Sequence, residues 1–310
     1  MKYFIGVDIG GTKVAIAVVS ETGKILKQNV IPTELTILPK EMIMKISNSI
    51  REILAQTEIV KNDIIGIGIG SPGPLDAKEG LITHPPNLQN WRNVPIVKWM
   101  KEWWSVPIIL ENDANAAALA EKWLGAAQDN QNFVYMTVST GIGSGIIADG
   151  KIYHGASGNA GDIGHTVVDP SFGQCSCGQY GCLESIASGT AIAKRGSDIL
   201  GKQVTTKDVF TLYDEGHLKI VAFINKVFKV LGVACVSIIN TFDPEKIVIG
   251  GGVSQVEAPL FEMIRDYVRN YALNPNGRNT TIVKAELDQN AGVIGAAALY
   301  LDKISANSKI

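Results

Sequence analysis

The sequence contains the same short succession of predicted elements twice. In residues 3–30, a strand, a glycine-rich turn at Gly10–Lys13 and a second strand are followed by an X-Gly-Lys turn and a third strand. In residues 133–152 the same order recurs, with its glycine-rich turn at 139–145. A supersecondary unit that repeats at well-separated places indicates an internal duplication. We therefore expect two similar domains that face each other.

Each glycine-rich turn is a candidate phosphate-binding loop. Glycines leave backbone N–H groups open to an anion that a side chain would otherwise keep away. A single such turn has a structural alternative, since Gly-Gly hairpins are common, but two matched turns favour phosphate binding. Asp8, just ahead of the first turn, could hold Mg²⁺ directly or through water, or could serve only to form the turn. Neither loop is a Walker loop, because no Gly-Lys-Ser/Thr follows at the required spacing.

Helical and strand patterns alternate in the rest of the chain. Apolar residues recur at helical spacing in residues 39–57, and residues 64–69 have the composition of a buried strand. Further strands are expected at 107–110 and 246–249, and further helices at 111–121, within 185–235, up to about Tyr271, and at 290–301. The alternation predicts an α/β fold with a sizeable core.

Asn112 and Asp113 lie where a predicted strand meets an alanine-rich predicted helix. Open α/β sheets place their ligand-binding groups at this boundary, outside the carboxyl ends of the strands. The alternative is that Asp113 is an ordinary helix N-cap. Taken alone, this stretch leaves both interpretations open.

Three loops add candidate contacts. The run Gly250–Gly252 between a strand and a helix allows a flat or anionic group to approach the backbone closely. The loops at 71–74 and 85–91 carry polar residues that could contact a ligand or cap turns.

One imidazole and three thiols lie close together in sequence, at His165, Cys175, Cys177 and Cys182. This set suits a closed tetrahedral zinc site of the structural kind. A disulfide or an iron–sulfur cluster is the alternative, but the odd number of thiols and the available histidine argue against both. Gly173, Gly178 and Gly181 suit a backbone that folds tightly around a metal. The metal would then fix the ends of the segment, where Asp162 and Glu184 lie.

Composition excludes several classes of function. The formal net charge of −2 gives no electrostatic reason to expect nucleic acid or an anionic membrane as partner. No apolar run approaches the length of a membrane span, and the first residues break their apolar run too early for a signal peptide. Because the four cysteines are few and mostly clustered, we expect a cytoplasmic protein.

Five motifs occur in one order along the chain. They are Asp8-Ile-Gly-Gly-Thr-Lys13, Glu111-Asn-Asp-Ala-Asn115, Ser139-Thr-Gly-Ile-Gly143, His165 with Cys175-x-Cys177-x4-Cys182-Leu-Glu184, and Gly250-Gly-Gly252. Together they resemble the ROK family of sugar kinases and repressors over essentially the whole chain. The cysteine segment and the Glu-Asn-Asp-Ala-Asn stretch are the specific parts of this resemblance.

The resemblance implies an actin/hexokinase-type fold, that is, two ribonuclease-H-like domains with a cleft between them. The N-terminal domain would comprise residues 1–120 joined by a C-terminal helix at 291–310, and the second domain residues 121–290 with the zinc-binding loop. The implied activity is ATP-dependent phosphorylation of the 6-hydroxyl of a hexose, with Mg²⁺ and a structural Zn²⁺, in a homodimer or homotetramer.

Carried over position by position, the resemblance assigns a role to each matching residue. Asp113 would be the general base, and the sugar would be bound by Gly73, Asn87, Asn112, Asp113, Asp162, His165 and Glu184. ATP and its Mg²⁺ would be bound by Asp8, Gly10, Gly11, Thr12, Lys13, Thr140, Gly141 and Gly143, with Gly251 and Gly252 beside the adenosine. His165 would both bind zinc and contact sugar, through different ring nitrogens.

One departure bears on the preferred sugar. The family has Glu where this chain has Asp162, and a side chain shorter by one methylene moves its carboxylate further than a hydrogen bond tolerates. Glucose is the expected substrate, with N-acetylmannosamine or N-acetylglucosamine as the alternative. A sugar-responsive repressor is less favoured, because the first phosphate strand starts near residue 2. A non-catalytic ATPase of the actin type would leave Asp113 and the cysteine loop without a purpose.

Overall fold

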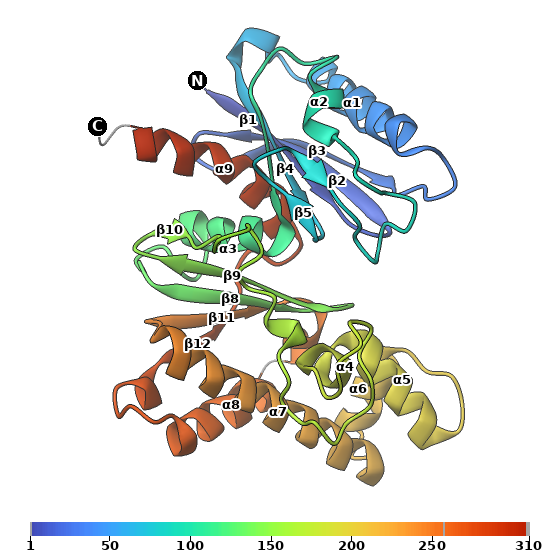
Figure 1. Cartoon of the computed structure of the whole chain (residues 1–310), viewed down its shortest axis with the longest axis vertical. Helices are drawn as coiled ribbons and strands as arrows, with labels where there is room; N and C mark the ends of the chain where they lie inside the picture. The colour runs from blue at the N-terminus through green and yellow to red at the C-terminus, as the bar shows by residue number, and fades with distance from the viewer. Residues whose placement is uncertain (1, 257, 308–310) are drawn as a thin grey trace. The chain divides into compact units, whose positions relative to one another are not determined.

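The protein divides into two compact units in the computed structural model, which describes residues 2–256 and 258–307 (Figure 1). Unit 1 consists of Met1–Asp129, Lys151–Ala160 and Leu287–Ile310, and unit 2 consists of Asn130–Gly150 and Gly161–Glu286. The chain forms two five-stranded sheets, one built on strands of unit 1 and the other mainly on strands of unit 2.

The sheet of unit 1 has the strand order β3-β2-β1-β4-β7. Its strands are β1 (Tyr3–Ile9), β2 (Lys13–Ser20), β3 (Ile25–Pro32), β4 (Ile64–Ser71) and β7 (Ile108–Asn112). The first three strands pair antiparallel through the two predicted turns, whereas β4 and β7 join the sheet parallel to β1. The parallel strands therefore bring their carboxyl ends to one edge of the sheet.

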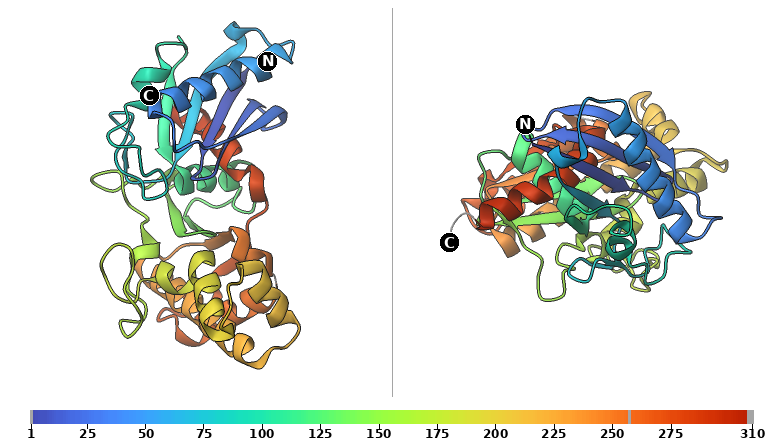
Figure 2. Two further views of the ribbon diagram at one scale, coloured as in Figure 1. Left: turned by 90° about the vertical axis from the view of Figure 1, so that its right-hand side faces the viewer. Right: turned by 90° about the horizontal axis from the view of Figure 1, so that it is seen from above.

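Two helices cover opposite faces of this sheet (Figure 2). Alternate residues of β1 and β2 pack against α1 (Pro39–Ala55) on one face, and the intervening residues pack against α9 (Ala291–Asn307) on the other. This two-residue alternation is what a strand with two buried faces requires.

Glycines on β1 and β4 allow α9 to approach the sheet very closely. A Cβ added at Gly6 would lie 2.0 Å from the carbonyl oxygen of Val293, and one at Gly68 would lie 1.8 Å from that of Ala296. Neither distance is compatible with a side chain, so the glycines are needed for close packing of the helix on the strands. α9 also packs against α3 (Asp113–Leu124).

Shorter elements complete unit 1. They are η1 (Lys61–Asp63), the two-stranded β5 (Leu75–Asp76) and β6 (Leu81–Ile82), α2 (Ile96–Met100) and η5 (Asp288–Asn290). Leu88 and Trp91 are fully buried in the core of this unit, and they anchor the loop between β6 and α2.

The sheet of unit 2 repeats the topology of unit 1, with the order β10-β9-β8-β11-β12. Its strands are β8 (Phe133–Val138), β9 (Ile142–Ala148), β11 (Lys246–Gly250) and β12 (Thr281–Lys284), with the two-residue edge strand β10 (Lys151–Ile152). β10 belongs to the segment Lys151–Ala160, which is otherwise grouped with unit 1. As in unit 1, the first two strands form an antiparallel hairpin and the last two lie parallel to the first. The predicted duplication is confirmed, and both sheets have the ribonuclease-H-like strand order.

The helices of unit 2 lie on one side of its sheet (Figure 1). They are α4 (Leu183–Ala187), α5 (Gly189–Leu200), α6 (Thr206–Asp214), α7 (Leu218–Phe242) and α8 (Ala258–Tyr271), with the short turns η2 (Ile163–His165), η3 (Gly252–Val256) and η4 (Gly277–Asn279). Apolar side chains of α7 and α8 form the core together with β8, β11 and β12.

α7 corrects the expectation that no segment approaches a membrane span. Its 25 residues are long and apolar enough to cross a bilayer by length and composition, with a mean hydropathy of 1.8 in the most apolar window. However, 56% of that window is buried inside the fold, and Phe228, Leu231 and Cys235 belong to the core of unit 2. The hydropathy of α7 therefore reflects a core helix.

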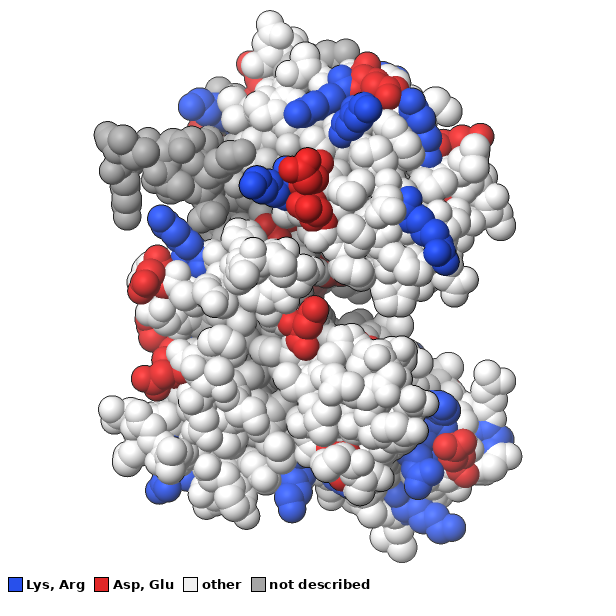
Figure 3. Space-filling view, viewed as in Figure 1, with Lys and Arg blue, Asp and Glu red and all other residues white. Residues whose placement is uncertain are grey.

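Charged side chains of both signs are interspersed on the surface that Figure 3 shows. This distribution agrees with the formal net charge of −2.

Candidate functional site

The candidate residues of unit 1 gather at the carboxyl edge of its parallel strands. Asp8 of β1 is in register with Gly70 of β4, and Gly70 is in register with Glu111 of β7. A Cβ added at Gly70 would lie 3.7 Å from the Cα of Asp113 and 3.8 Å from Oδ1 of Asp8. Asp8 and Asp113 therefore both lie next to Gly70, at the same edge of the sheet.

Asn112, and not Asp113, is the N-cap of α3. Its Oδ1 accepts hydrogen bonds from the backbone N–H groups of Ala114, at 2.9 Å, and Asn115, at 3.3 Å. Asp113 is the first helical residue, and its Oδ1 accepts from Ala114 at 2.8 Å. The interpretation of Asp113 as an ordinary N-cap is therefore wrong, because the side chain of Asn112 accepts the capping hydrogen bonds.

The two aspartates of this edge have perturbed acidities. Burial raises the pKa of Asp113 above its ordinary value, and hydrogen bonds from the backbone N–H groups of Ala114 and Asp113 partly offset this effect. Burial also raises the pKa of Asp8 to about 7, with a further rise from the charge of Asp113 and a lowering from Lys13. Two buried carboxyls with raised pKa values, one of them raised further by the charge of the other, are an arrangement found at catalytic and cation-binding sites.

The first glycine-rich turn lies beside the other candidate residues of unit 1. The turn is closed by a hydrogen bond of 2.9 Å from Gly10 N–H to the carbonyl of Lys13. A Cβ added at Gly11 would lie 3.0 Å from the Cβ of Asn87, and one at Gly73 would lie 3.5 Å from Nδ2 of Asn112. Asn87 therefore adjoins the turn, and Gly73 adjoins the strand–helix junction.

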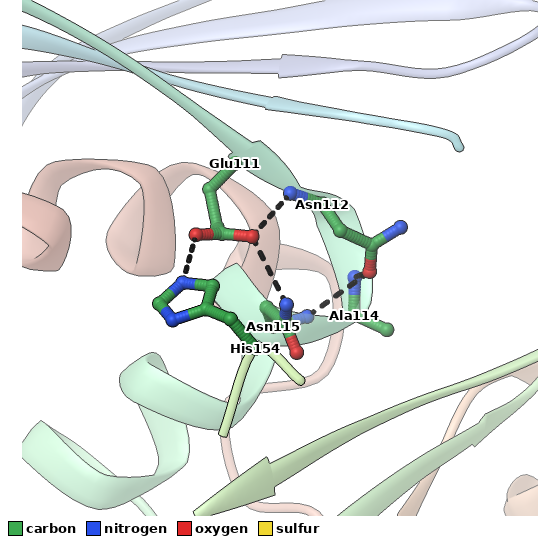
Figure 4. Close-up of polar contacts among 5 residues, drawn as sticks. All are labelled: Glu111, Asn112, Ala114, Asn115 and His154. Carbon is green, nitrogen blue, oxygen red and sulfur yellow. Dashed lines mark hydrogen bonds and ion pairs between the residues drawn. The ribbon is translucent and has the colours of Figure 1, made fainter. Parts of the chain in front are cut away.

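A contact that the sequence did not reveal supports this junction (Figure 4). The buried carboxylate of Glu111 accepts hydrogen bonds from Asn112 N–H at 2.9 Å and from Nδ2 of Asn115 at 3.0 Å. Its other oxygen lies 2.8 Å from Nε2 of His154. Glu111 belongs to a recognised motif, but His154 is 43 positions away and no spacing pattern connects the two.

A second unforeseen contact involves α9. A Cβ added at Gly292 would lie 2.1 Å from Oδ2 of Asp8. Only glycine at this position allows the first turn of α9 to press against that carboxylate.

The two predicted nucleotide-binding elements of unit 2 are neighbours. The second glycine-rich turn, predicted at 139–145, is shorter in the structure: residues 139–141 join β8 to β9, which begins at Ile142. Gly251 follows β11, which pairs with β8. Gly251 has a φ of 88°, and a Cβ there would lie 2.4 Å from the carbonyl oxygen of Val138. The left-handed backbone and the close approach both require glycine at Gly251, the middle residue of the run.

The histidine and cysteine side chains gather as predicted. The candidate ligand atoms of His165, Cys175, Cys177 and Cys182 all lie within 4.8 Å of one another. Sγ of Cys175 is 3.6 Å from Nδ1 of His165, and Sγ of Cys177 is 3.6 Å from Sγ of Cys182. Ligands bound to one tetrahedral zinc would lie roughly 3.3–3.8 Å apart. None of the cysteines forms a disulfide in the part of the chain described, so the set fits zinc.

The backbone of this segment is folded tightly around the thiols. Cys175 and Gln179 are joined by a hydrogen bond of 2.7 Å, and Gly178 and Gly181 have φ values of 94° and 74°. Gly173 does not adopt a positive φ, so the expectation for that glycine is wrong. Gly181 is also required by space, because a Cβ would lie 1.8 Å from the carbonyl oxygen of Asp169.

The candidate sugar-binding residues of unit 2 flank the cysteine cluster. Asp162 is exposed and lies immediately before η2, the turn that carries His165. Because Nδ1 of His165 is directed at Cys175, its Nε2 remains for another contact. Glu184 lies in the first turn of α4, and its Oε2 accepts a hydrogen bond of 2.8 Å from Ile142 N–H.

The predicted residues are divided between the two units. Unit 1 contains Asp8, Gly10, Gly11, Thr12, Lys13, Gly73, Asn87, Asn112 and Asp113, and unit 2 contains Thr140, Gly141, Gly143, Asp162, His165, Cys175, Cys177, Cys182, Glu184, Gly251 and Gly252.

Two ribonuclease-H-like units with a glycine-rich turn between their first two strands define an actin/hexokinase-type fold. The profile of the ROK family matches residues 4–303. A glucokinase from Halalkalibacterium halodurans is 36% identical, over 99% of this chain and 97% of its own. The protein belongs to the ROK family.

Two solved structures extend the similarity to three dimensions. A ROK hexokinase from Thermus thermophilus has a TM-score of 0.85 and 33% identity, over 98% of this chain and 99% of its own. A ROK family glucokinase from Streptomyces griseus, in complex with glucose and AMPPNP, has a TM-score of 0.81 and 30% identity, over 96% of this chain and 98% of its own.

Proposed function

We propose that the protein is an ATP-dependent hexokinase that phosphorylates the 6-hydroxyl of glucose. The observation that carries the proposal is the pair Asp8 and Asp113 at the carboxyl edge of unit 1, where burial raises the pKa of both carboxyls. Similarity to a glucokinase at 36% identity, and to a glucokinase structure that holds glucose and AMPPNP, supports it.

In this proposal Asp113 is the general base. As the 6-oxygen forms its bond to the γ-phosphorus, the carboxylate accepts the hydroxyl proton, and ADP leaves with the electrons of the broken P–O bond. A raised pKa makes the ionised form of Asp113 a stronger base than a surface aspartate. Asn112, whose side-chain oxygen is used in the helix cap, would keep its NH₂ group for a sugar oxygen.

The glycine-rich turns would bind the phosphates, and Asp8 would hold Mg²⁺ directly or through water. A buried carboxyl whose pKa is raised by a second carboxyl suits a divalent cation, because the cation offsets the repulsion between them. Bound Mg²⁺ would neutralise phosphate charge. Zinc, held by His165 and the three thiols, would fix Asp162 and Glu184 and take no part in bond making.

A coupled assay of the purified protein with MgATP tests the proposal. Glucose should be phosphorylated with the highest kcat/KM in a panel that includes mannose, fructose, N-acetylglucosamine and N-acetylmannosamine. The N-acetyl sugars are essential members, because Asp162 stands where the family has Glu. Polyphosphate in place of ATP identifies the phosphoryl donor. Absence of turnover with every sugar would disprove the proposal. A higher kcat/KM for an N-acetyl sugar would show that this sugar, and not glucose, is the substrate.

A further inference from the structure

Glu184 contacts both the second glycine-rich turn and the segment that carries His165. Its Oε2 accepts from Ile142 N–H at 2.8 Å, immediately after the turn. A Cβ added at Gly141 would lie 2.5 Å from the same oxygen, so the turn itself lies against the carboxylate. Oε1 of Glu184 accepts no hydrogen bond from the residues that the structure describes, and it is the atom left for a ligand.

The other end of the turn is held by the same piece of chain. Gly189 N–H donates to the carbonyl of Ser139 at 2.7 Å, and Ser139 N–H donates to the carbonyl of Gly141 at 2.9 Å. Ser188 links the two contacts, because its N–H donates to the carbonyl of Glu184 at 3.2 Å and its side chain caps α5. The junction of α4 and α5 therefore forms hydrogen bonds with both ends of the turn, through Glu184 to Ile142 and through Gly189 to Ser139.

The segment that carries His165 contacts the other backbone group of Ile142, its carbonyl. A Cβ added at Gly164 would lie 2.2 Å from the carbonyl oxygen of Ile142. Leu183, next to Glu184, donates its N–H to the carbonyl of Thr166 at 2.9 Å. Both backbone groups of Ile142 are thus in contact with residues from the sugar-binding part of unit 2.

We propose that Glu184 is a positioning residue that couples sugar binding to the geometry of the phosphate-binding turn. This inference rests on the proposed function of the site. A sugar hydroxyl that donates to Oε1 restricts the rotation of the side chain, and the hydrogen bond from Oε2 then holds Ile142 N–H and the turn in one arrangement. Because binding linkage is reciprocal, sugar tightens nucleotide binding and nucleotide tightens sugar binding by the same factor.

Two measurements test the coupling. Hydrogen–deuterium exchange of the peptide spanning residues 139–146, resolved to single amides by fragmentation, follows the Ile142 amide. Titration with a fluorescent ADP analogue gives the nucleotide Kd with and without saturating glucose. In the wild type we expect glucose to slow the exchange and to lower the nucleotide Kd by about fivefold or more. In Glu184→Ala the exchange should be fast in both states, and the nucleotide Kd should not respond to glucose.

Further variants separate the two contacts of Glu184. Glu184→Gln keeps an oxygen for Ile142 but replaces Oε1 by an NH₂ group when the amide is so oriented, so it should weaken glucose binding while the resting exchange stays near wild type. Gly141→Ala places a methyl group against Oε2 of Glu184, so it should separate the turn from the carboxylate and abolish the response of the nucleotide Kd to glucose. Glu215→Gln, on the surface of the same unit, is the matched control and should behave as the wild type.

The outcomes distinguish this inference from the proposed function. If Gly141→Ala and Glu184→Ala keep the wild-type response of the nucleotide Kd to glucose, Glu184 does not couple the ligands. A wild type that phosphorylates glucose but shows no coupling also disproves the inference, and leaves the function intact. A wild type that phosphorylates no sugar disproves the function, whereas faster exchange of the Ile142 amide in ligand-free Glu184→Ala still establishes the contact.

Discussion

Glu111 and His154 join two segments of unit 1 that are 43 positions apart, through a contact of 2.8 Å between Oε2 and Nε2. Glu111 is buried, whereas about half of the His154 side chain is exposed. The contact attaches the segment Lys151–Ala160 to the strand–helix junction that carries Asp113.

The unequal burial of these partners predicts unequal effects of their removal. Glu111→Ala leaves the N–H of Asn112 and the side-chain NH₂ of Asn115 without their acceptor, and should lower the free energy of unfolding by roughly 2 kcal/mol or more. His154→Ala should cost about 1 kcal/mol or less, but should raise hydrogen exchange in residues 151–160. Tyr153→Ala, half exposed on the same segment, is the control for the exchange experiment. Equal losses of stability in urea denaturation would contradict this assignment.

Replacement of the proposed base should separate catalysis from binding. Asp113→Asn removes the proton acceptor with almost no change in shape, so kcat should fall by roughly 10²–10⁴-fold. The Kd for glucose, measured calorimetrically, should stay within about threefold, because the amide still offers hydrogen bonds. Asp149→Asn is the control, since this aspartate lies in the turn before β10 with a φ of 50° that asparagine tolerates. A variant with near-normal turnover would exclude Asp113 as the base.

Asp8 should make the ligand-free protein less stable as the pH rises. Its pKa is about 7 in the folded protein, against 3.8 for an unperturbed aspartate. Between these values the folded state binds more protons than the unfolded state, so stability falls as the pH increases from about 4 to about 7 and the full loss is present above that. Asp8→Asn removes the effect and should be more stable than the wild type at pH 8, by roughly 2–4 kcal/mol.

Urea denaturation at several pH values, without Mg²⁺ or nucleotide, measures this difference, which should shrink toward zero near pH 4. Asp208 provides a control of opposite sign. Hydrogen bonds from Thr205 lower its pKa, so Asp208→Asn should lose stability at neutral pH and approach the wild type as the pH falls through the folded pKa. A stability gain for Asp8→Asn that is equal at pH 4 and pH 8 would show that charge is not its cause.

The four clustered ligands should hold about one zinc per chain, and the protein should be colourless. Cys177→Ser removes the exposed thiol of the cluster and should lower the zinc content measured by mass spectrometry after dialysis. Glucose binding should weaken with it, because Glu184 follows the cluster directly. Cys235→Ala, which removes the buried thiol outside the cluster, should keep its zinc. A brown protein, or a wild type without zinc, would overturn the assignment.

Much of this organisation follows from short stretches of sequence. The duplicated hairpins, the boundary at Asn112 and Asp113, and the spacing of the cysteines are local patterns, and the structure has the corresponding elements. Such patterns are informative because glycine turns, helical periodicity and closely spaced ligands act over a few residues.

The remaining features exist only in the tertiary structure. No sequence pattern near His154 predicts its contact with Glu111, and none near Glu184 predicts its hydrogen bond with Ile142. The raised pKa of Asp8 likewise depends on burial and on Asp113, 105 positions further along the chain. Contacts between distant segments and the desolvation that they cause depend on how whole elements pack, and no local pattern encodes that packing.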